Sequence, residues 1–450
     1  MKKPEFVLHA FLALSLAINY AHASVSDEQA NALKSTLTPL GAERAGNSDG
    51  SIPEWTGGLT ADVPGDKFGD VPANLFPGEE PLFTITAENA DQHADKLNEG
   101  TRALLQQFPD SFYLKVYPSH RTAAAPQWVY DNTFTNATQC KLTHEGLSVE
   151  GCYGGIPFPI PQNGSEVLWN FLLRVEAESI EHGYLNIIGN SDGSRTLASR
   201  GVENWQYPYY YQDGNAADWH GKYVLLRFLT NEPPFKAGEA LVTHDSINAA
   251  SPRDAWQYLV GQRRVRRAPT VGYDTPDFVA SGANYFDEVH GFIGHPDRYD
   301  WKLVGKKEMY IPYNLNSFHA QPREAVYTEG VLNSEAMRWE LHRVWEVEAT
   351  LASGKRHAVP KRRFFIDEDS WTIALTDGYD AEDKLWRVSQ ALPFAVPAIP
   401  AVVVKPVVIY NLQANTYSMV QGLNGENYRV VSRKSENFFT GNAVAAGSAR

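Results

Sequence analysis

Residues 256–278 have the sequence WQYLVGQRRVRRAPTVGYDTPDF. In the first five residues, aromatic and apolar side chains alternate in the manner typical of a β-strand. A basic cluster follows, with four arginines among five residues, and after it comes a turn rich in Gly, Tyr, Asp, Thr and Pro. The segment therefore predicts a strand that runs directly into a basic cluster, in a chain whose formal net charge is −13. The cluster consists of Arg263, Arg264, Arg266 and Arg267.

Three interpretations of this arginine cluster can be compared. A nucleic-acid surface is disfavoured by the acidic net charge of the chain. A site for a phosphate or carboxylate head group fits, because arginine forms bidentate hydrogen bonds with both. We favour the third interpretation, in which most of these arginines pair with acidic side chains of the same protein. The candidate ligand-binding residues are Trp256, Tyr258, Arg263, Arg264, Arg266 and Arg267.

The first 23 residues have the features of a secretory signal peptide. Lys2 and Lys3 form a positive start, residues 6–18 are mostly apolar, and residues 21–23, AHA, are typical of a cleavage site. We therefore expect export and cleavage after Ala23. No later stretch has about 18 uninterrupted apolar residues, so no transmembrane helix is predicted.

Only two cysteines are present, Cys140 and Cys152. In an exported protein, two cysteines this close in sequence predict a disulfide. Two reduced thiols are the alternative. A metal site is disfavoured because no matching ligands lie near them in the sequence.

The mature chain is predicted to be mainly β (α+β), with antiparallel strands and a few helices. From residue 183 onward, alternating apolar patterns and turn signals follow one another almost without a break. Residues 337–351, MRWELHRVWEVEATL, favour a long strand over a helix. Residues 128–130, WVY, also predict a strand, and Ser165 predicts the start of a helix.

The chain divides into four predicted parts. A signal peptide occupies residues 1–23. Helices and an extended arm occupy residues 24–112, and the β body with its helical cover occupies residues 113–440. Residues 441–450 are small and polar and predict a flexible tail.

Candidate catalytic and metal-binding residues are few. We expect no serine nucleophile elbow, zinc-protease helix, phosphate loop or dinucleotide fingerprint. A zinc site is disfavoured against surface or hydrogen-bonded histidines. The histidines compared are His290 and His295, five positions apart, and the scattered His319, His342 and His357. Asn47 and Asp49 favour an Asx-type turn over a calcium loop, which would need further acidic ligands. Residues 367–369, DED, are disfavoured as a catalytic pair because neighbouring side chains should point to different faces. The sequence predicts no catalytic residue, metal or cofactor.

Five long segments resemble one family of exported Gram-negative proteins, domain-of-unknown-function family 1329. They span almost the whole mature chain. They are residues 45–58, 150–175, 261–277, 294–314 and 342–371.

This family in turn is similar to the outer-membrane lipoprotein-sorting proteins. The resemblance implies a large antiparallel half-open β-barrel, with helices that cover a hydrophobic cavity. It also implies a periplasmic, non-enzymatic carrier or adaptor for a lipid or another hydrophobic molecule in outer-membrane sorting or envelope transport. An inner-membrane exporter and an outer-membrane β-barrel protein are the implied protein partners, and no nucleic acid is implied.

Two alternatives to the carrier remain. The protein could be a structural partner in an envelope transport complex, with an exposed aromatic run at residues 207–211, YPYYY, as its interface. It could also be an enzyme or a glycan-binding protein that uses aromatic platforms.

Overall fold

The computed structural model describes residues 25–248, 251, 253–268 and 271–448, with side chains described up to residue 444 at the C-terminal end. The predicted signal peptide therefore lies outside the described residues. Within the described part of the chain, no helix combines the length and the apolar character needed to cross a membrane.

One large sheet of 16 strands forms the body of the protein. Its first half is an antiparallel meander in which each strand pairs with the next one along the chain. This is the first meander. Its strands are β7 (Ser179–Gly189), β8 (Arg195–Gln206), β9 (Lys222–Glu232), β10 (Ala240–Ser246), β11 (Asp254–Leu259) and β12 (Arg264–Arg267).

The second half is also an antiparallel meander, the second meander. It includes the long strand β14, as the alternation in residues 337–351 predicts. Strand β21 pairs with β7 and so joins the two halves. The strands of the second meander are β13 (Tyr299–Pro312), β14 (Trp339–Leu351), β15 (Lys361–Asp367), β16 (Ile373–Tyr379), β17 (Leu385–Ala391), β20 (Val407–Asn411) and β21 (Thr416–Gly422).

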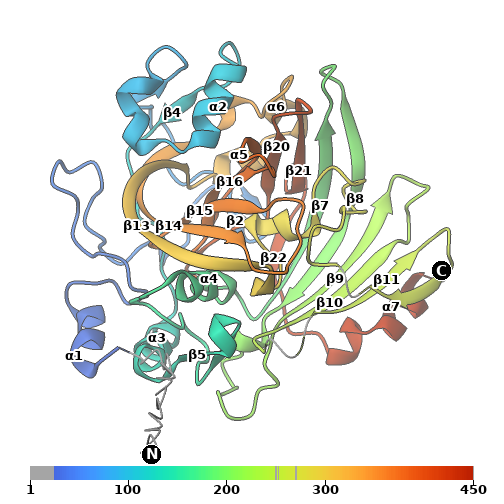
Figure 1. Cartoon of the computed structure of the whole chain (residues 1–450), viewed down its shortest axis with the longest axis horizontal. Coiled ribbons are helices and arrows are strands. Elements are labelled where there is room, and N and C mark those ends of the chain that lie inside the picture. Colours follow the sequence, from blue (N-terminus) through green and yellow to red (C-terminus); the bar gives the residue numbers. More distant parts are fainter. Residues whose placement is uncertain (1–24, 249–250, 252, 269–270, 449–450) are drawn as a thin grey trace, which may run out of the picture.

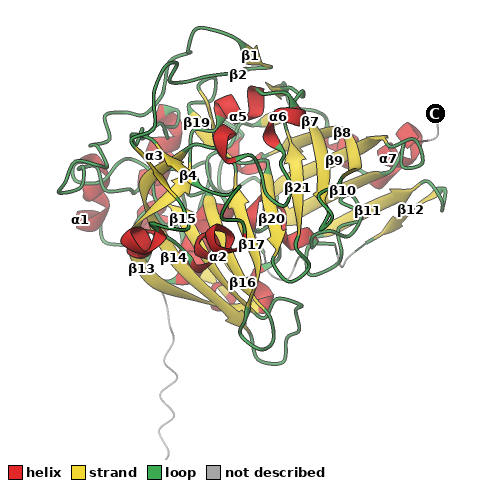
Figure 2. Cartoon of the chain, turned by 90° about the horizontal axis from the view of Figure 1, so that it is seen from above, coloured by secondary structure: helices red, strands yellow, loops and turns green. Residues whose placement is uncertain are grey.

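The sheet curves but does not close into a barrel. In the described residues, β12 pairs only with β11, and β13 pairs only with β14. Figures 1 and 2 show these two ends on opposite sides of the molecule. The half-open, mainly β architecture implied by the resemblance is therefore confirmed.

The two faces of the first meander have different covers, because successive side chains of a strand point to opposite faces. On one face, which we call the inner face, Phe228 and Leu241 pack against the segment 271–291. On the other, the outer face, Leu225 and Val242 pack against Phe439 and Val444 near the C-terminus. The segment 271–291 ends with the 3₁₀ helix η5 (Phe286–Gly291), and Val444 lies in helix α7 (Gly441–Ser448).

Shorter elements line the second half of the sheet and the N-terminal arm. Helix α4 lies against β13 and β14. The arm crosses to the last strand, where Gly69 pairs with Tyr428 and the backbone N–H of Val430 donates to Asp70. The helices are α1 (Asp27–Ala30), α2 (Glu99–Gln107), α3 (Gln127–Gln139), α4 (Gly164–Leu172), α5 (Asn316–Ala320) and α6 (Arg323–Val326). The 3₁₀ helices are η1 (Asn31–Lys34), η2 (Ala90–Lys96), η3 (His144–Gly146), η4 (Pro208–Tyr210), η6 (Pro296–Arg298), η7 (Ser334–Ala336) and η8 (Glu436–Phe439). Three short strands complete the 16-stranded sheet, namely β3 (Phe83–Ile85), β4 (Leu114–Val116) and β22 (Tyr428–Val430). The other strands form two-stranded sheets, which are β1 (Lys67–Phe68) with β2 (Val71–Pro72), β5 (Lys141–Thr143) with β6 (Ser148–Glu150), and β18 (Phe394–Val396) with β19 (Ala401–Val403).

Several local expectations differ from the structure. Residues 128–130 belong to helix α3, where the Thr133 hydroxyl donates to the carbonyl of Val129, so the strand prediction was wrong. Helix α4 begins one residue before Ser165 and is capped by Asn163, whose side chain accepts from the backbone N–H of Glu166. The sequence predicts a flexible tail after Thr440, whereas residues 441–448 form α7 over the outer face.

Candidate functional site

The structure confirms the predicted disulfide. Cys140 caps the end of α3 and is bonded to Cys152, which follows strand β6. The bridge fixes the short β5–β6 hairpin against α3. Both cysteines are buried in the largest apolar cluster of the described residues.

Trp256 and Tyr258 lie on the outer face of β11. They pack with Val265 against the C-terminal segment that contains Phe439 and Val444. The ring of Trp256 lies edge-on to His244, with centroids 5.1 Å apart. Both aromatic side chains are thus half-buried beneath α7.

The arginine cluster lies on the edge of the sheet. Arg263 occupies the turn between β11 and β12 with φ 49°, and the other three arginines lie on β12 with exposed side chains. In the described residues, one of the four forms an ion pair, between Arg267 and Asp254 at 3.4 Å. The expectation that most of them pair with carboxylates was wrong. Charged side chains on an edge strand oppose pairing with another chain, which gives the cluster a structural role.

A pocket opens beside the outer face, between β9, β10 and the loop 207–222. Its volume is about 450 Å³, within the range of small-molecule sites. Five of its lining residues form an apolar and aromatic wall. They are Tyr153, Pro208, Tyr211, Trp219 and Leu225.

The rings of this wall are held in place by neighbouring groups. Trp219 packs edge-on against Tyr153 and Tyr209, with centroid distances of 5.8 and 5.3 Å. The hydroxyl of Tyr153 donates to the carbonyl of Tyr211 at 2.7 Å. Burial raises the pKa of both Tyr153 and Tyr211 to about 12, so both phenols stay uncharged near neutral pH.

Polar side chains complete the pocket. The polar lining consists of three carboxylates, one lysine, two histidines and Asn215, and Gly214 also lies in the wall. Asp213 is neutralised by Arg433 at 2.7 Å, and Lys222 lies 3.7 Å from Asp254. Asp218 and Glu436 also line the pocket, and neither forms an ion pair with a described residue. The pocket therefore carries two uncompensated carboxylates.

His244 fixes the floor of the pocket. Its Nε2 donates to the carbonyl of Phe439 at 2.6 Å, which leaves Nδ1 to accept from the ammonium of Lys222 at 2.9 Å. Burial lowers the pKa of His244, in agreement with this neutral imidazole. The ring thus links β10 to the C-terminal segment.

The inner face offers much less space. The cavity between this face and the segment 271–291 has a volume of about 40 Å³, which suffices for water molecules but not for an acyl chain. Polar side chains, among them Glu203 and Gln421, lie beside Trp205 and Phe228 in its wall. The hydrophobic cavity implied by the resemblance is thus not found beneath this cover. The outer-face pocket is the candidate binding site.

The residues that the sequence analysis considered for catalysis or metal binding make contacts that stabilise the fold. Asp49 accepts from the backbone N–H of Ser51, which is the expected Asx-type turn. Asp367 is the last residue of β15, Glu368 and Asp369 follow in the turn to β16, and all three are buried. His290 is buried against Trp205, and His295 pairs with Asp297.

The pattern of a serine nucleophile elbow does occur in the chain. Residues 46–50 and 189–193 both have the sequence GNSDG. The serines of both segments are exposed in turns, and an elbow requires a turn from a strand into a helix. In the second segment, Asp192 accepts from Ser194 within the β7–β8 connection. Neither segment is therefore a nucleophile elbow.

Comparison with known proteins identifies the family. The family described as "Protein of unknown function (DUF1329)" matches residues 84–445. An uncharacterized protein of Pseudomonas aeruginosa is 42% identical over 407 residues, which cover 87% of each chain.

Solved structures show weaker similarity. A DUF1329 family protein from Desulfovibrio piger has a TM-score of 0.43 and 13% identity, over 62% of this chain and 97% of that one. A LolA superfamily protein from Nitrosomonas europaea has a TM-score of 0.37 and 9% identity, over 62% and 98%. The family match and the Pseudomonas relative together extend over most of the sequence, so the chain belongs to the DUF1329 family.

Proposed function

We propose that this protein is a periplasmic, non-enzymatic carrier of a hydrophobic small molecule, which it holds in the outer-face pocket. The observation that carries this proposal is the pocket of about 450 Å³ with its aromatic wall of Tyr153, Tyr211 and Trp219. Apolar burial in such a wall contributes about 0.8 kcal/mol per CH₂ group of the ligand. About ten buried methylene groups would therefore supply the roughly 8 kcal/mol that micromolar affinity requires.

The charges of the pocket restrict the ligand further. The two uncompensated carboxylates, Asp218 and Glu436, would repel an acidic head group. A neutral or cationic amphipathic molecule fits better, with its apolar part against Trp219 and a hydroxyl or amine near Asp218. This differs from the acidic head group that the arginine cluster suggests.

The disulfide supports the proposed compartment. Disulfides persist in oxidising compartments such as the bacterial periplasm and are rare in the cytosol. Cys140 and Cys152 are bonded and buried. The exporter and the outer-membrane β-barrel partner remain predictions that follow from the family resemblance.

The experiment begins with native mass spectrometry of the protein purified from the periplasm of its own cells. We expect a bound molecule that organic solvent releases. The purified protein is then titrated with a long-chain fatty acid, a long-chain amine and a long-chain alcohol of equal length. The amine and the alcohol should bind more tightly than the acid.

The variants Trp219→Ala and Tyr211→Ala should each weaken binding at least tenfold. Phe235→Ala is the matched control, because Phe235 is 75% exposed at the tip of the β9–β10 hairpin. The proposal is wrong if no molecule co-purifies and none of the three probes binds. Binding that survives both pocket substitutions would place the ligand elsewhere. Selective binding of a glycan panel would instead support the glycan-binding alternative.

A further inference from the structure

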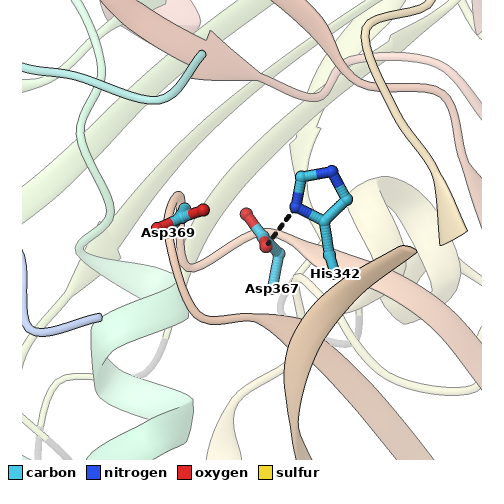
Figure 3. Close-up of side chains that lie close together, drawn as sticks. All are labelled: His342, Asp367 and Asp369. Carbon is cyan, nitrogen blue, oxygen red and sulfur yellow. Dashed lines mark ion pairs between the residues drawn. The ribbon is translucent and has the colours of Figure 1, made fainter. Parts of the chain in front are cut away.

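A cluster of three side chains that could bind a metal ion lies inside the second meander, apart from the outer-face pocket. It contains His342 on β14, Asp367 at the end of β15, and Asp369 in the turn to β16 (Figure 3). One ligating atom from each of these residues lies within 4.8 Å of the other two. The three residues are 1%, 0% and 3% exposed. The sequence presents His342 as a possible zinc ligand and residues 367–369 as possible catalytic carboxylates, but it does not combine them, because β14 and the β15–β16 turn meet only in the fold.

The imidazole of His342 is oriented toward Asp367. Its Nε2 lies 3.1 Å from a carboxylate oxygen of Glu340 and donates to it. Its Nδ1 lies 3.9 Å from Oδ1 of Asp367, a contact that is an ion pair when the ring is protonated and that Figure 3 marks with a dashed line. When the ring is neutral, this Nδ1 has a lone pair that can bind a cation. A carboxylate that holds the far nitrogen of an imidazole is the usual support of a metal-binding histidine. The ring of Tyr313 packs on the imidazole, with centroids 4.0 Å apart.

Asp367 presents an unpartnered acceptor to this imidazole. Its Oδ2 accepts from the hydroxyl and the backbone N–H of Ser370 and from the hydroxyl of Tyr313. Its Oδ1 accepts no hydrogen bond, although it is completely buried. A buried carboxylate oxygen without a donor is costly and calls for an explanation. A cation between Oδ1 and Nδ1 of His342 would provide one.

Asp369 can supply a third ligand. Arg121 holds it in a bidentate pair, with Nη2–Oδ1 and Nε–Oδ2 distances of 2.6 and 2.8 Å. Each carboxylate oxygen has a second lone pair, so this pair leaves the oxygens able to bind a cation. The guanidinium fixes the position of the carboxylate beside Asp367.

The ion pairs around the cluster form two groups among the described residues. In the first group, three cations balance three carboxylates: Arg121, Lys306 and Arg343 with Glu43, Glu368 and Asp369. In the second group, Arg338 is the one permanently charged cation, and the carboxylates are Glu79, Glu340 and Asp367, with His120 and His342 beside them. A cation at His342 would therefore add positive charge where carboxylates are in excess.

We propose that Nδ1 of His342, Oδ1 of Asp367 and a carboxylate oxygen of Asp369 bind a structural divalent transition-metal ion. Mixed imidazole and carboxylate donors suit Zn²⁺ and Mn²⁺. Bond lengths of about 2.0–2.2 Å require the three atoms to draw together by about 1 Å. Because the ligands come from β14 and from the β15–β16 turn, the ion would connect these two parts of the second meander. The inference is independent of the proposed carrier function.

The test uses the full-length mature protein without a histidine tag. Its metal content is measured by inductively coupled plasma mass spectrometry, before and after dialysis against a chelator. We expect about one Zn²⁺ or Mn²⁺ per chain, a lower melting temperature after chelation, and recovery when that metal is returned. Mg²⁺ should not restore it. The proposal is overturned if less than a tenth of an ion is bound and no added cation shifts the melting temperature.

Substitutions locate the ion. His342→Gln and Asp367→Asn should each weaken metal affinity at least tenfold. His295→Gln is the matched control, because His295 also lies beside a carboxylate, that of Asp297 at 3.1 Å. If the cluster variants do not fold, X-ray absorption of the metal-loaded wild-type protein decides. One nitrogen and at least two oxygen ligands support the site, and a shell without nitrogen overturns it.

Discussion

Arg362 on β15 holds Asp287 of η5 with two hydrogen bonds, Nη1–Oδ2 at 3.0 Å and Nη2–Oδ1 at 3.1 Å. Both side chains are buried, and His357 adds a third contact to Asp287 at 2.9 Å. Asp287 belongs to the segment that covers the inner face of the first meander, whereas Arg362 belongs to the second meander. The pair therefore ties the cover of one half of the sheet to the strands of the other.

Replacement of Asp287 by Asn should destabilise the protein strongly. Burial raises the pKa of Asp287, but Arg362 and His357 outweigh this effect and lower the pKa to about 2, so the carboxylate is ionised at neutral pH. The substitution leaves Arg362 buried without its counter-charge, which costs about 3–5 kcal/mol. Urea unfolding at pH 7 measures the loss. Glu324→Gln, which removes an exposed ion pair with Arg323, should cost less than about 1 kcal/mol. Equal effects of the two substitutions would contradict this account.

Asp377 should make stability fall as pH rises. Burial raises its pKa to about 7, although Asn98 and the backbone N–H of Gly100 donate to it. The folded protein thus keeps a proton that the unfolded chain releases above its usual pKa of 3.8. Between about pH 4 and pH 7 this group therefore lowers the free energy of unfolding as pH increases.

Asp377→Asn tests this pH dependence. The amide oxygen can still accept from Asn98 and Gly100, so the variant should match the wild type near pH 4. At pH 8 it should be more stable, by up to about 4 kcal/mol. Unfolding curves across this pH range measure the difference, and Asp110→Asn, at an exposed position, serves as the control. A difference that does not change with pH would refute the prediction.

Removal of the disulfide should cost about 3 kcal/mol in the chain-entropy model. The double variant Cys140→Ser, Cys152→Ser opens a loop with a sequence separation of 12 residues. Urea unfolding of this variant and of the reduced wild type should give similar losses. Unchanged stability in both would show that packing of α3 alone holds the hairpin.

The edge-strand arginines should keep the protein monomeric. Arg264→Thr with Arg266→Thr removes two charges from β12 and leaves its backbone groups free to pair with another chain. Light scattering should show self-association that increases with concentration. Arg323→Thr with Arg356→Thr changes the net charge equally at exposed positions away from this edge and should remain monomeric.

The same pair of variants tests whether the arginines bind ligand. If the pocket is the binding site, Arg264→Thr with Arg266→Thr leaves ligand affinity unchanged at concentrations where the protein is monomeric. A tenfold loss of affinity would instead support the site predicted from the sequence.

The β-structure could be predicted where side chains of different character alternate along a strand. The alternation in residues 337–351 and 256–260 marked β14 and β11, because successive side chains of a strand point to opposite faces. The strand prediction for residues 128–130 was wrong because the preference of Trp, Val and Tyr for strands depends on context, and here their packing in helix α3 outweighs it. The aromatic run 207–211 was expected on the surface as an interface. Tyr207, Tyr209 and Tyr210 are instead buried.

The sites could not be predicted for a different reason. Arg121 and Asp369 are 248 positions apart in sequence, and only the fold brings them together. The wall of the pocket likewise combines Tyr153 from beyond the disulfide with Trp219 from the loop before β9. Local patterns reveal faces and turns, whereas both sites depend on contacts between distant segments.

The junction of the two meanders bears on how the chain folds. Within each meander a strand pairs with the next strand of that meander, but β7 pairs with β21, where Ile188 lies opposite Ser418. Pairing of such distant segments requires the closure of a long loop, so it forms late and slowly. Each meander can nucleate alone, whereas the complete sheet waits for its last strands. A polypeptide with this connectivity should therefore complete its sheet only after its C-terminal strands have been synthesised.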